Sequence, residues 1–276
     1  MSIDLLLFSS FLALSLILGI ISSTKVHNIS EYAIGNRDFS TPTLTATLIA
    51  TYIGAGIFSY TLIETYRQGI YFLIPASAES ISLLIVGYIL APRMGEFLGK
   101  LSIAESMGEM FGPRVRLITV IFGFMRLICY LSVNFKVSSK ILELIFGTSG
   151  EYATILSALI VIIYSTLGGI RAVTFTDIIQ FFTFGCLVPV ITIIAWQALG
   201  EKSSAMVLHT LTTSALFDYK AVFDLTNPKL YEMLVMCVFF MVPDLGPDIF
   251  QRISMGRSVG QVMRSFMIAG FVCFLF

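Results

Sequence analysis

Charged residues are scarce in this chain of 276 residues: Asp, Glu, Lys and Arg make up 12% of it, whereas soluble domains carry about 25%. The 17 basic and 17 acidic residues balance, so nothing indicates a nucleic-acid partner. Hydrophobic residues account for 57% of the chain. This composition excludes an ordinary soluble domain and predicts an all-α, multi-pass membrane protein whose surroundings are a lipid bilayer.

Cysteine and histidine are also few, and neither forms a reactive pattern. The cysteines stand singly in apolar segments, without metal-ligand spacing or a disulfide framework: Cys129, Cys186, Cys237 and Cys273. His27 and His209 both fall in connections between apolar segments. With no Ser/His, His/Glu or paired-Asp constellation either, the sequence argues against an intramembrane enzyme, and we expect no catalytic residue.

Apolar segments of near-spanning length follow one another along the chain. Most approach the roughly 20 residues that a helix needs to cross a bilayer, while the fifth is short. The segments are 5–22, 41–63, 70–91, 117–135, 152–167, 175–198, 231–250 and 259–276. The last runs to Phe276 without a polar tail, which favours the front part of a longer protein.

The basic residues of the connections indicate the orientation, because cytoplasmic loops carry an excess of Lys and Arg. With the first helix starting outside, the inside connections hold Lys25, Arg37, Arg93, Lys100, Arg114, Arg116, Arg171, Arg252, Arg257 and Arg264. The outside connections hold fewer, namely Arg67, Lys136, Lys140, Lys202, Lys220 and Lys229. This bias predicts an external N-terminus in a cell membrane, with a bacterial inner membrane favoured.

The second apolar segment contains a weak point in its middle. Residues 41–64 hold Gly54, Ala55 and Gly56 in succession, and each glycine costs a helix about 1 kcal/mol relative to alanine. If the helix opens there, the carbonyls of residues 50–53 lose their amide partners and become ligands for an ion or solute. Close packing of a neighbouring helix on these small residues explains the pattern equally well.

A second weak point lies in residues 231–251. Pro243 and Pro247 each remove a backbone donor, Gly246 stands between them, and Asp244 and Asp248 flank the interruption. Broken segments in corresponding positions of two halves indicate a transporter binding site. The alternative is a plain loop with both aspartates in water.

The spacing of the two interruptions predicts the domain organisation. The second interrupted segment is the fifth span after the first, as expected for two five-helix repeats of opposite topology. We therefore expect a leading helix and connection (1–40), a first repeat (41–200), an external loop (201–230) and the start of a second, incomplete repeat (231–276).

Ionisable residues inside spans are costly and become functional hypotheses by default. Glu79 lies within the third segment and Arg126 within the fourth. An ion pair between the two would satisfy both charges. Lys136 and Lys140 lie near a helix end, where they can extend to the interface.

Four stretches resemble the solute:sodium symporter family, which includes sodium-coupled sugar, proline and pantothenate carriers. Residues 31–37 (EYAIGNR) resemble its (D/E)YFLAGR, and residues 47–54 (TLIATYIG) its SLIAxNIS-type core. Residues 164–180 resemble Y(T/S)xxGGLxAVxxTDxxQ, and residues 251–258 resemble QRxLxAKS.

This resemblance implies that sodium, the expected cofactor, is held by the backbone carbonyls of Ala50 and Ile53, with Asp177 on its inward route. Asp177 also begins an apolar span, where the N-terminus of a helix favours an anion. A structural charge at a helix end is its alternative role.

For the solute, the resemblance implies a small organic molecule bound between the interrupted helices. The expected contacts are Gly54, Ala55, Gly56, Asn134, Gly246 and Asp248. Asn134 is equally compatible with a bridge between helices. Asp248 favours a cationic or amine-bearing solute or serves as a helix cap, and Tyr52 departs from the small polar or acidic residue usual in the family.

The expected activity is therefore sodium-coupled symport by alternating access. Two alternatives stay open at this point. One is a sensory module of histidine-kinase type, whose partner would be a downstream signalling domain. The other is a truncated remnant that binds but does not transport, lacking its C-terminal half.

Overall fold

The computed structural model describes residues 3–23, 26–147, 150–198 and 203–276, and every regular element in these ranges is helical. The helices are α1 (Ile3–Ser23), α2 (Ile29–Ile34), α3 (Thr41–Tyr52), α4 (Ala55–Gln68), α5 (Ile70–Ile85), α6 (Ile103–Phe111), α7 (Pro113–Phe146), α8 (Gly150–Ala198), α9 (Ser203–Thr213), α10 (Tyr219–Val222), α11 (Pro228–Met241), α12 (Pro247–Ser254) and α13 (Val259–Leu275). Short turns of other helix types, η1 (Gly35–Arg37), η2 (Val86–Leu90), η3 (Ala91–Arg93) and η4 (Gly95–Phe97), join some of them.

Several helices are long and apolar enough to cross a bilayer. Ile70–Arg93, Pro113–Phe146 and Gly150–Ala198 each qualify, and the bent pair formed by α3 and α4 adds a fourth span. Leu5–Ile21 and Val259–Leu275 are shorter apolar helices. The all-helical, multi-pass architecture expected from composition is thus confirmed in the described part of the chain.

Two helix boundaries differ from the expectation. The apolar segment 117–135 is only the middle of α7, which has 34 residues and continues through both lysines to Phe146. The segments 152–167 and 175–198 are both parts of α8, which begins at Gly150. Hydrophobicity marks where a helix lies in lipid, but backbone hydrogen bonding carries the helix beyond that region.

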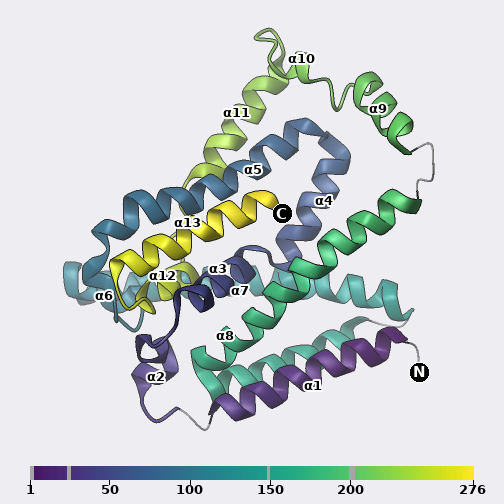
Figure 1. Ribbon diagram of the computed structural model, residues 1–276. Coiled ribbons are helices and arrows are strands. Elements are labelled where there is room, and N and C mark those ends of the chain that lie inside the picture. Colours follow the sequence, from purple (N-terminus) through teal and green to yellow (C-terminus); the bar gives the residue numbers. More distant parts are fainter. Residues whose placement is uncertain (1–2, 24–25, 148–149, 199–202) are drawn as a thin grey trace.

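Helix α8 reverses direction at Gly169, and Figure 1 shows its two limbs as a V. Gly169 has φ 54° and ψ −148°, a backbone conformation open mainly to glycine. A Cβ at this position would lie 2.6 Å from the carbonyl oxygen of Tyr32. The Gly-Gly pair of the third motif therefore makes the turn between two spans.

The core forms where α3 is enclosed by other helices. In Figure 1 the first limb of α8 lies along α1, while the second limb crosses α3, which also packs against α13. Helix α5 packs against α11 and α13. Fully buried side chains fill this centre, among them Leu44, Leu48, Leu83, Phe250 and Phe266.

On one side of the molecule, the segment before α3 is held by polar side chains. Arg37 donates to the carbonyl of Gly256 (2.7 Å), and Arg257 donates to the carbonyl of Asp38 (2.7 Å). Arg171 donates to the carbonyl of Gly35 (3.1 Å). These bonds join the connections that precede α3, divide α8 and follow α12, so all three lie on the same side.

The turn at Gly169 generates a stability prediction. Gly169→Ala should lower the free energy of unfolding by more than about 1 kcal/mol, because alanine is strained at positive φ and its methyl group meets the Tyr32 carbonyl. Thermal unfolding in detergent measures the loss. Gly260→Ala is the matched control, since a Cβ there meets nothing within 4 Å. Equal unfolding midpoints for the two variants would contradict the prediction.

Candidate functional site

The first interruption lies at Ile53 and Gly54. Helix α3 ends at Tyr52, Ile53 leaves the helical region with φ −88° and ψ 59°, and Gly54 is extended with φ −80° and ψ 156°. The chain then re-enters a helix, and the two axes differ by 52°. Of the two interpretations of the glycines, the structure supports the opened helix.

The opening leaves backbone oxygens without their helical partners. The amide of Ile53 still donates to Ile49 (2.8 Å), and the amide of Phe58 donates to Gly54 (2.9 Å). Among the described residues, no backbone amide donates to the carbonyls of Ala50 or Ile53. Both predicted sodium ligands thus have free oxygens, next to the buried residues of α3.

The second interruption spans residues 242–246. Helix α11 ends at Met241, Val242 and Gly246 are extended (ψ 123° and 169°), and α12 begins at Pro247. The Asp244 carboxylate accepts the amide of Gly246 at 3.0 Å and so supports the open backbone. The break expected from the two prolines is therefore present.

Arg126 of α7 binds both aspartates of this break. Its Nη1 donates to Asp248 Oδ1 at 2.9 Å, and its Nη2 pairs with Asp244. The guanidinium lies so close to the backbone that a Cβ on Gly246 would be 1.8 Å from Nη1. The expected pairing of Arg126 with Glu79 is wrong, because the two aspartates at the second break already occupy the guanidinium.

One face of α7 contacts both interruptions. Gly123, Arg126, Tyr130 and Asn134 follow one another at spacings of three and four residues, which places them on one helix face. A Cβ on Gly123 would lie 3.4 Å from Pro247, the first residue of α12 directly after the second break. This face therefore links the two breaks.

The first break meets the same face farther along α7. A Cβ on Gly54 would lie 3.5 Å from the Tyr130 hydroxyl, and one on Gly56 would lie 3.2 Å from Asn134 Oδ1. The Asn134 amide nitrogen donates to the Tyr130 carbonyl (2.9 Å), which leaves the oxygen directed to Gly56. The structure thus brings Gly54, Gly56 and Asn134 together, while the side chain of Ala55 lies outside the described residues.

Asp177 is buried between α8, α3 and α12. The Thr47 hydroxyl donates to its carboxylate, and Arg252 Nη2 lies 3.1 Å from its Oδ2. The expected place in a first helical turn is wrong, because the helix resumes directly after Gly169 and Asp177 lies about two turns beyond. Its carboxylate is held by a buried ion pair, one helical turn from Ala50 along α3.

A cavity of about 400 Å³ opens beside the first break, lined by Tyr52, Ile53 and Glu79 among others. Glu79 makes no hydrogen bond or ion pair with the described residues. The Tyr52 hydroxyl is shielded from solvent and also has no partner among them. Cavities of this size hold small organic ligands.

Sequence reasoning missed the residues that bind Asp177 and those that lie beside Asn134. Arg252 lies in the QR motif and Thr47 in the first broken helix, yet neither position reveals that both bind Asp177. Tyr130 stands one helical turn before Asn134, a spacing that shows a shared face but not what the face contacts. Only the fold brings these side chains together.

Residues 32–276 match the model of the Sodium:solute symporter family. The chain belongs to this family. This is a family of membrane transporters and not of enzymes, and membership implies sodium coupling and a small solute. Sodium is in this setting a co-substrate, which corrects its earlier description as a cofactor.

Individual relatives are distant. The Sodium/pantothenate symporter of Haemophilus influenzae is 27% identical over 74% of the chain and 43% of its own length. The Sodium/glucose cotransporter of Vibrio parahaemolyticus is 24% identical over 98% of the chain and 52% of its own length. High affinity choline transporter 1 of Homo sapiens is 25% identical over 67% and 34%. The chain thus spans about half or less of the length of these relatives.

The buried pair of Asp177 and Arg252 generates a prediction. Arg252→Ala should cost about 3–5 kcal/mol in unfolding free energy, because it leaves a carboxylate buried without its cation. Asp177→Asn in the same chain should recover part of that loss. Unfolding of both variants in detergent measures the coupling.

The exposed pair of Lys140 and Glu143 (3.0 Å) serves as the control. Lys140→Ala should change stability by less than about 1 kcal/mol. A double variant at 177 and 252 that is less stable than Arg252→Ala alone would contradict the proposed compensation.

Proposed function

We propose that this chain forms the sodium-binding and solute-binding part of a sodium-coupled symporter for a small organic solute. The observation that carries the proposal is the open backbone of the first interruption, with its unbonded carbonyls at Ala50 and Ile53. Backbone oxygen at membrane depth is tolerated where it faces protein or a cavity. Family membership supports the sodium coupling.

Sodium binds at the free carbonyls of Ala50 and Ile53. These are hard, uncharged oxygen ligands that are already released from helical hydrogen bonding, so binding sodium breaks no bond within α3. Asp177 lies near the same helix and receives the ion on its inward route. Because Arg252 neutralises Asp177, sodium passes there briefly and does not remain.

The solute binds between the two breaks, near Gly54, Ala55, Gly56, Asn134, Gly246 and Asp248. The face of α7 that contacts both interruptions supports this location, as does the cavity beside Ile53. Arg126 orders the second break, so Asp248 acts through an ion pair and not as a free carboxylate. Rocking of the helices that carry the breaks then exposes the site to each side in turn.

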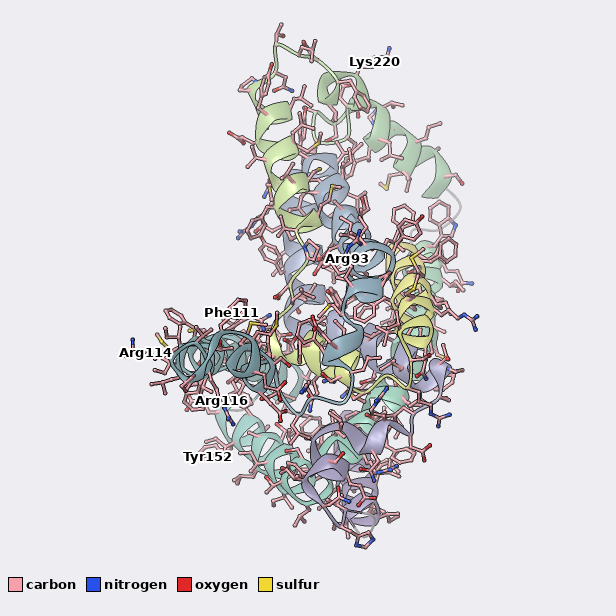
Figure 2. The ribbon with its side chains drawn as sticks, turned by 90° about the vertical axis from the view of Figure 1, so that its left-hand side faces the viewer. Arg93, Phe111, Arg114, Arg116, Tyr152 and Lys220 are labelled. Atoms are coloured by element: carbon pink, nitrogen blue, oxygen red, sulfur yellow. The ribbon has the colours of Figure 1, made fainter. Side chains whose placement is uncertain are left out.

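The two interrupted helices head two inverted five-helix repeats, the first at 41–200 and the second beginning at 231. The N-terminus faces outward. In support, Arg93, Arg114 and Arg116, which this orientation assigns to the inside, lie well away from Lys220, which it assigns to the outside, at the top edge of the molecule in Figure 2. An excess of basic residues marks the cytoplasmic side.

Direct binding of radioactive sodium to the purified chain in nanodiscs tests the function. We expect saturable binding that unlabelled sodium displaces and equal potassium does not. Gly54→Ala should weaken it by up to about fivefold, because alanine favours the closed helix by about 1 kcal/mol.

Gly260→Ala, which lies outside both breaks and whose Cβ meets nothing within 4 Å, should leave sodium affinity unchanged. Equal displacement by sodium and potassium would refute the proposed function. Unchanged affinity in Gly54→Ala would refute the location of the site at the first break.

A further inference from the structure

The space around the two breaks carries more negative than positive charge. Glu79 lies in the cavity wall, and Asp244 and Asp248 flank the second break. All three carboxylates lie within electrostatic reach of the Tyr52 hydroxyl at the first break. Among the described residues at these breaks, Arg126 is the positively charged residue that pairs with carboxylates of this group.

Arg126 cannot compensate all three carboxylates. Its two terminal nitrogens, Nη1 and Nη2, are engaged by Asp248 and Asp244, so this cluster keeps one negative charge, and Glu79 in its ionised form adds another. Asp177 does not change the net charge around the two breaks, because Arg252 neutralises it. Two negative charges therefore remain uncompensated beside the candidate site.

Glu79 is the carboxylate that faces the cavity. It has no hydrogen bond or ion pair among the described residues, and the charge that acts on it electrostatically is the like charge of Asp244. An isolated carboxylate in a membrane interior is costly and is retained where it meets a cationic partner. Sodium at the first break supplies one positive charge, which leaves one negative charge to be met.

We propose that the solute of this site is a small organic cation, an amine or quaternary ammonium compound, whose positive charge pairs with Glu79. This inference rests on the proposed sodium symport and adds the charge class of its solute. Sodium and a monovalent cationic solute together neutralise the two excess charges. An anionic solute would instead bring a third uncompensated negative charge into the membrane interior.

The rest of the cavity wall suits such a molecule. Tyr52 and Phe58 supply aromatic rings that interact favourably with cations. Thr61, Ser77 and Ser80 add hydroxyl groups that accept hydrogen bonds from an ammonium group. Most of the remaining lining is apolar, which accommodates the carbon skeleton of the solute.

The experiment compares three probes that share a trimethyl head and a similar size and differ in charge. Choline, its uncharged analogue 3,3-dimethylbutan-1-ol and the anion 3,3-dimethylbutanoate are each titrated into the purified chain in saturating sodium. The shift of the thermal unfolding midpoint gives the apparent affinity. We expect choline to bind at least about tenfold more tightly than the uncharged analogue and the anion not to bind.

Variants of two carboxylates locate the effect. Glu79→Gln should abolish the preference for the cation, whereas Glu79→Asp should retain part of it and shows that the site still folds. Glu143→Gln, which removes an exposed carboxylate, should leave the preference unchanged. Equal binding of choline and its uncharged analogue, or an unchanged preference in Glu79→Gln, would overturn the proposal.

The outcomes separate this inference from the proposed function. Tighter choline binding in both sodium and potassium would support the cationic solute while sodium coupling fails. Sodium binding without preference for the cationic probe would leave the symporter intact and overturn the charge class.

Discussion

The constraint on which this structure depends is that a backbone group inside a membrane must have a partner. A continuous helix satisfies this requirement with its own backbone hydrogen bonds. The helix is interrupted at Ile53–Gly54 and again at residues 242–246, so backbone groups at these two places lack their helical partners. Each opening is therefore lined by other protein: the first lies on the cavity wall and against α7, and the second holds its own Asp244 against the Gly246 amide.

Helix α7 shows how one element serves both openings. It is largely exposed along its length, and its Gly123–Asn134 face carries the contacts to the breaks. A guanidinium is suited to the second break because its planar, forked donors reach two carboxylates at once. A lysine at position 126 would supply the charge without this geometry. The identity of this residue thus follows from the two aspartates opposite it.

The sequence predicts those features whose causes are local. Gly54 and Gly56, and the prolines at 243 and 247, weaken a helix wherever it is placed, so both interruptions could be found by reading along the chain. The turn at Gly169 also has a local cause, since its Gly-Gly pair lies within a recognisable motif. The lengths of α7 and α8 were less accessible, because hydrophobicity does not mark where a helix ends once it leaves lipid.

Ion pairs could not be predicted in this way. Arg126 has Glu79 as an equally reasonable partner in sequence, and only the packing of α7 against the second break selects Asp244 and Asp248. Asp177 was expected near a helix start and open to the ion, and its pairing with Arg252 arises from residues 75 positions apart. Charge pairing across helices depends on distances that periodicity does not encode.

The charge distribution also constrains how sodium and a cationic solute can assist one another. Two positive charges bound near each other repel, and this repulsion is strong in a medium of low dielectric constant. The two excess negative charges, one on Glu79 and one on the cluster of Asp244, Asp248 and Arg126, attract both cations. This attraction offsets the repulsion between the cations only while both negative charges are present. Under the proposed assignment, cooperative binding comes from geometry, because sodium held by Ala50 and Ile53 is expected to fix the bend of α3 against α4, next to the cavity wall at Tyr52. The proposal therefore makes the broken helix the element that couples the two binding events.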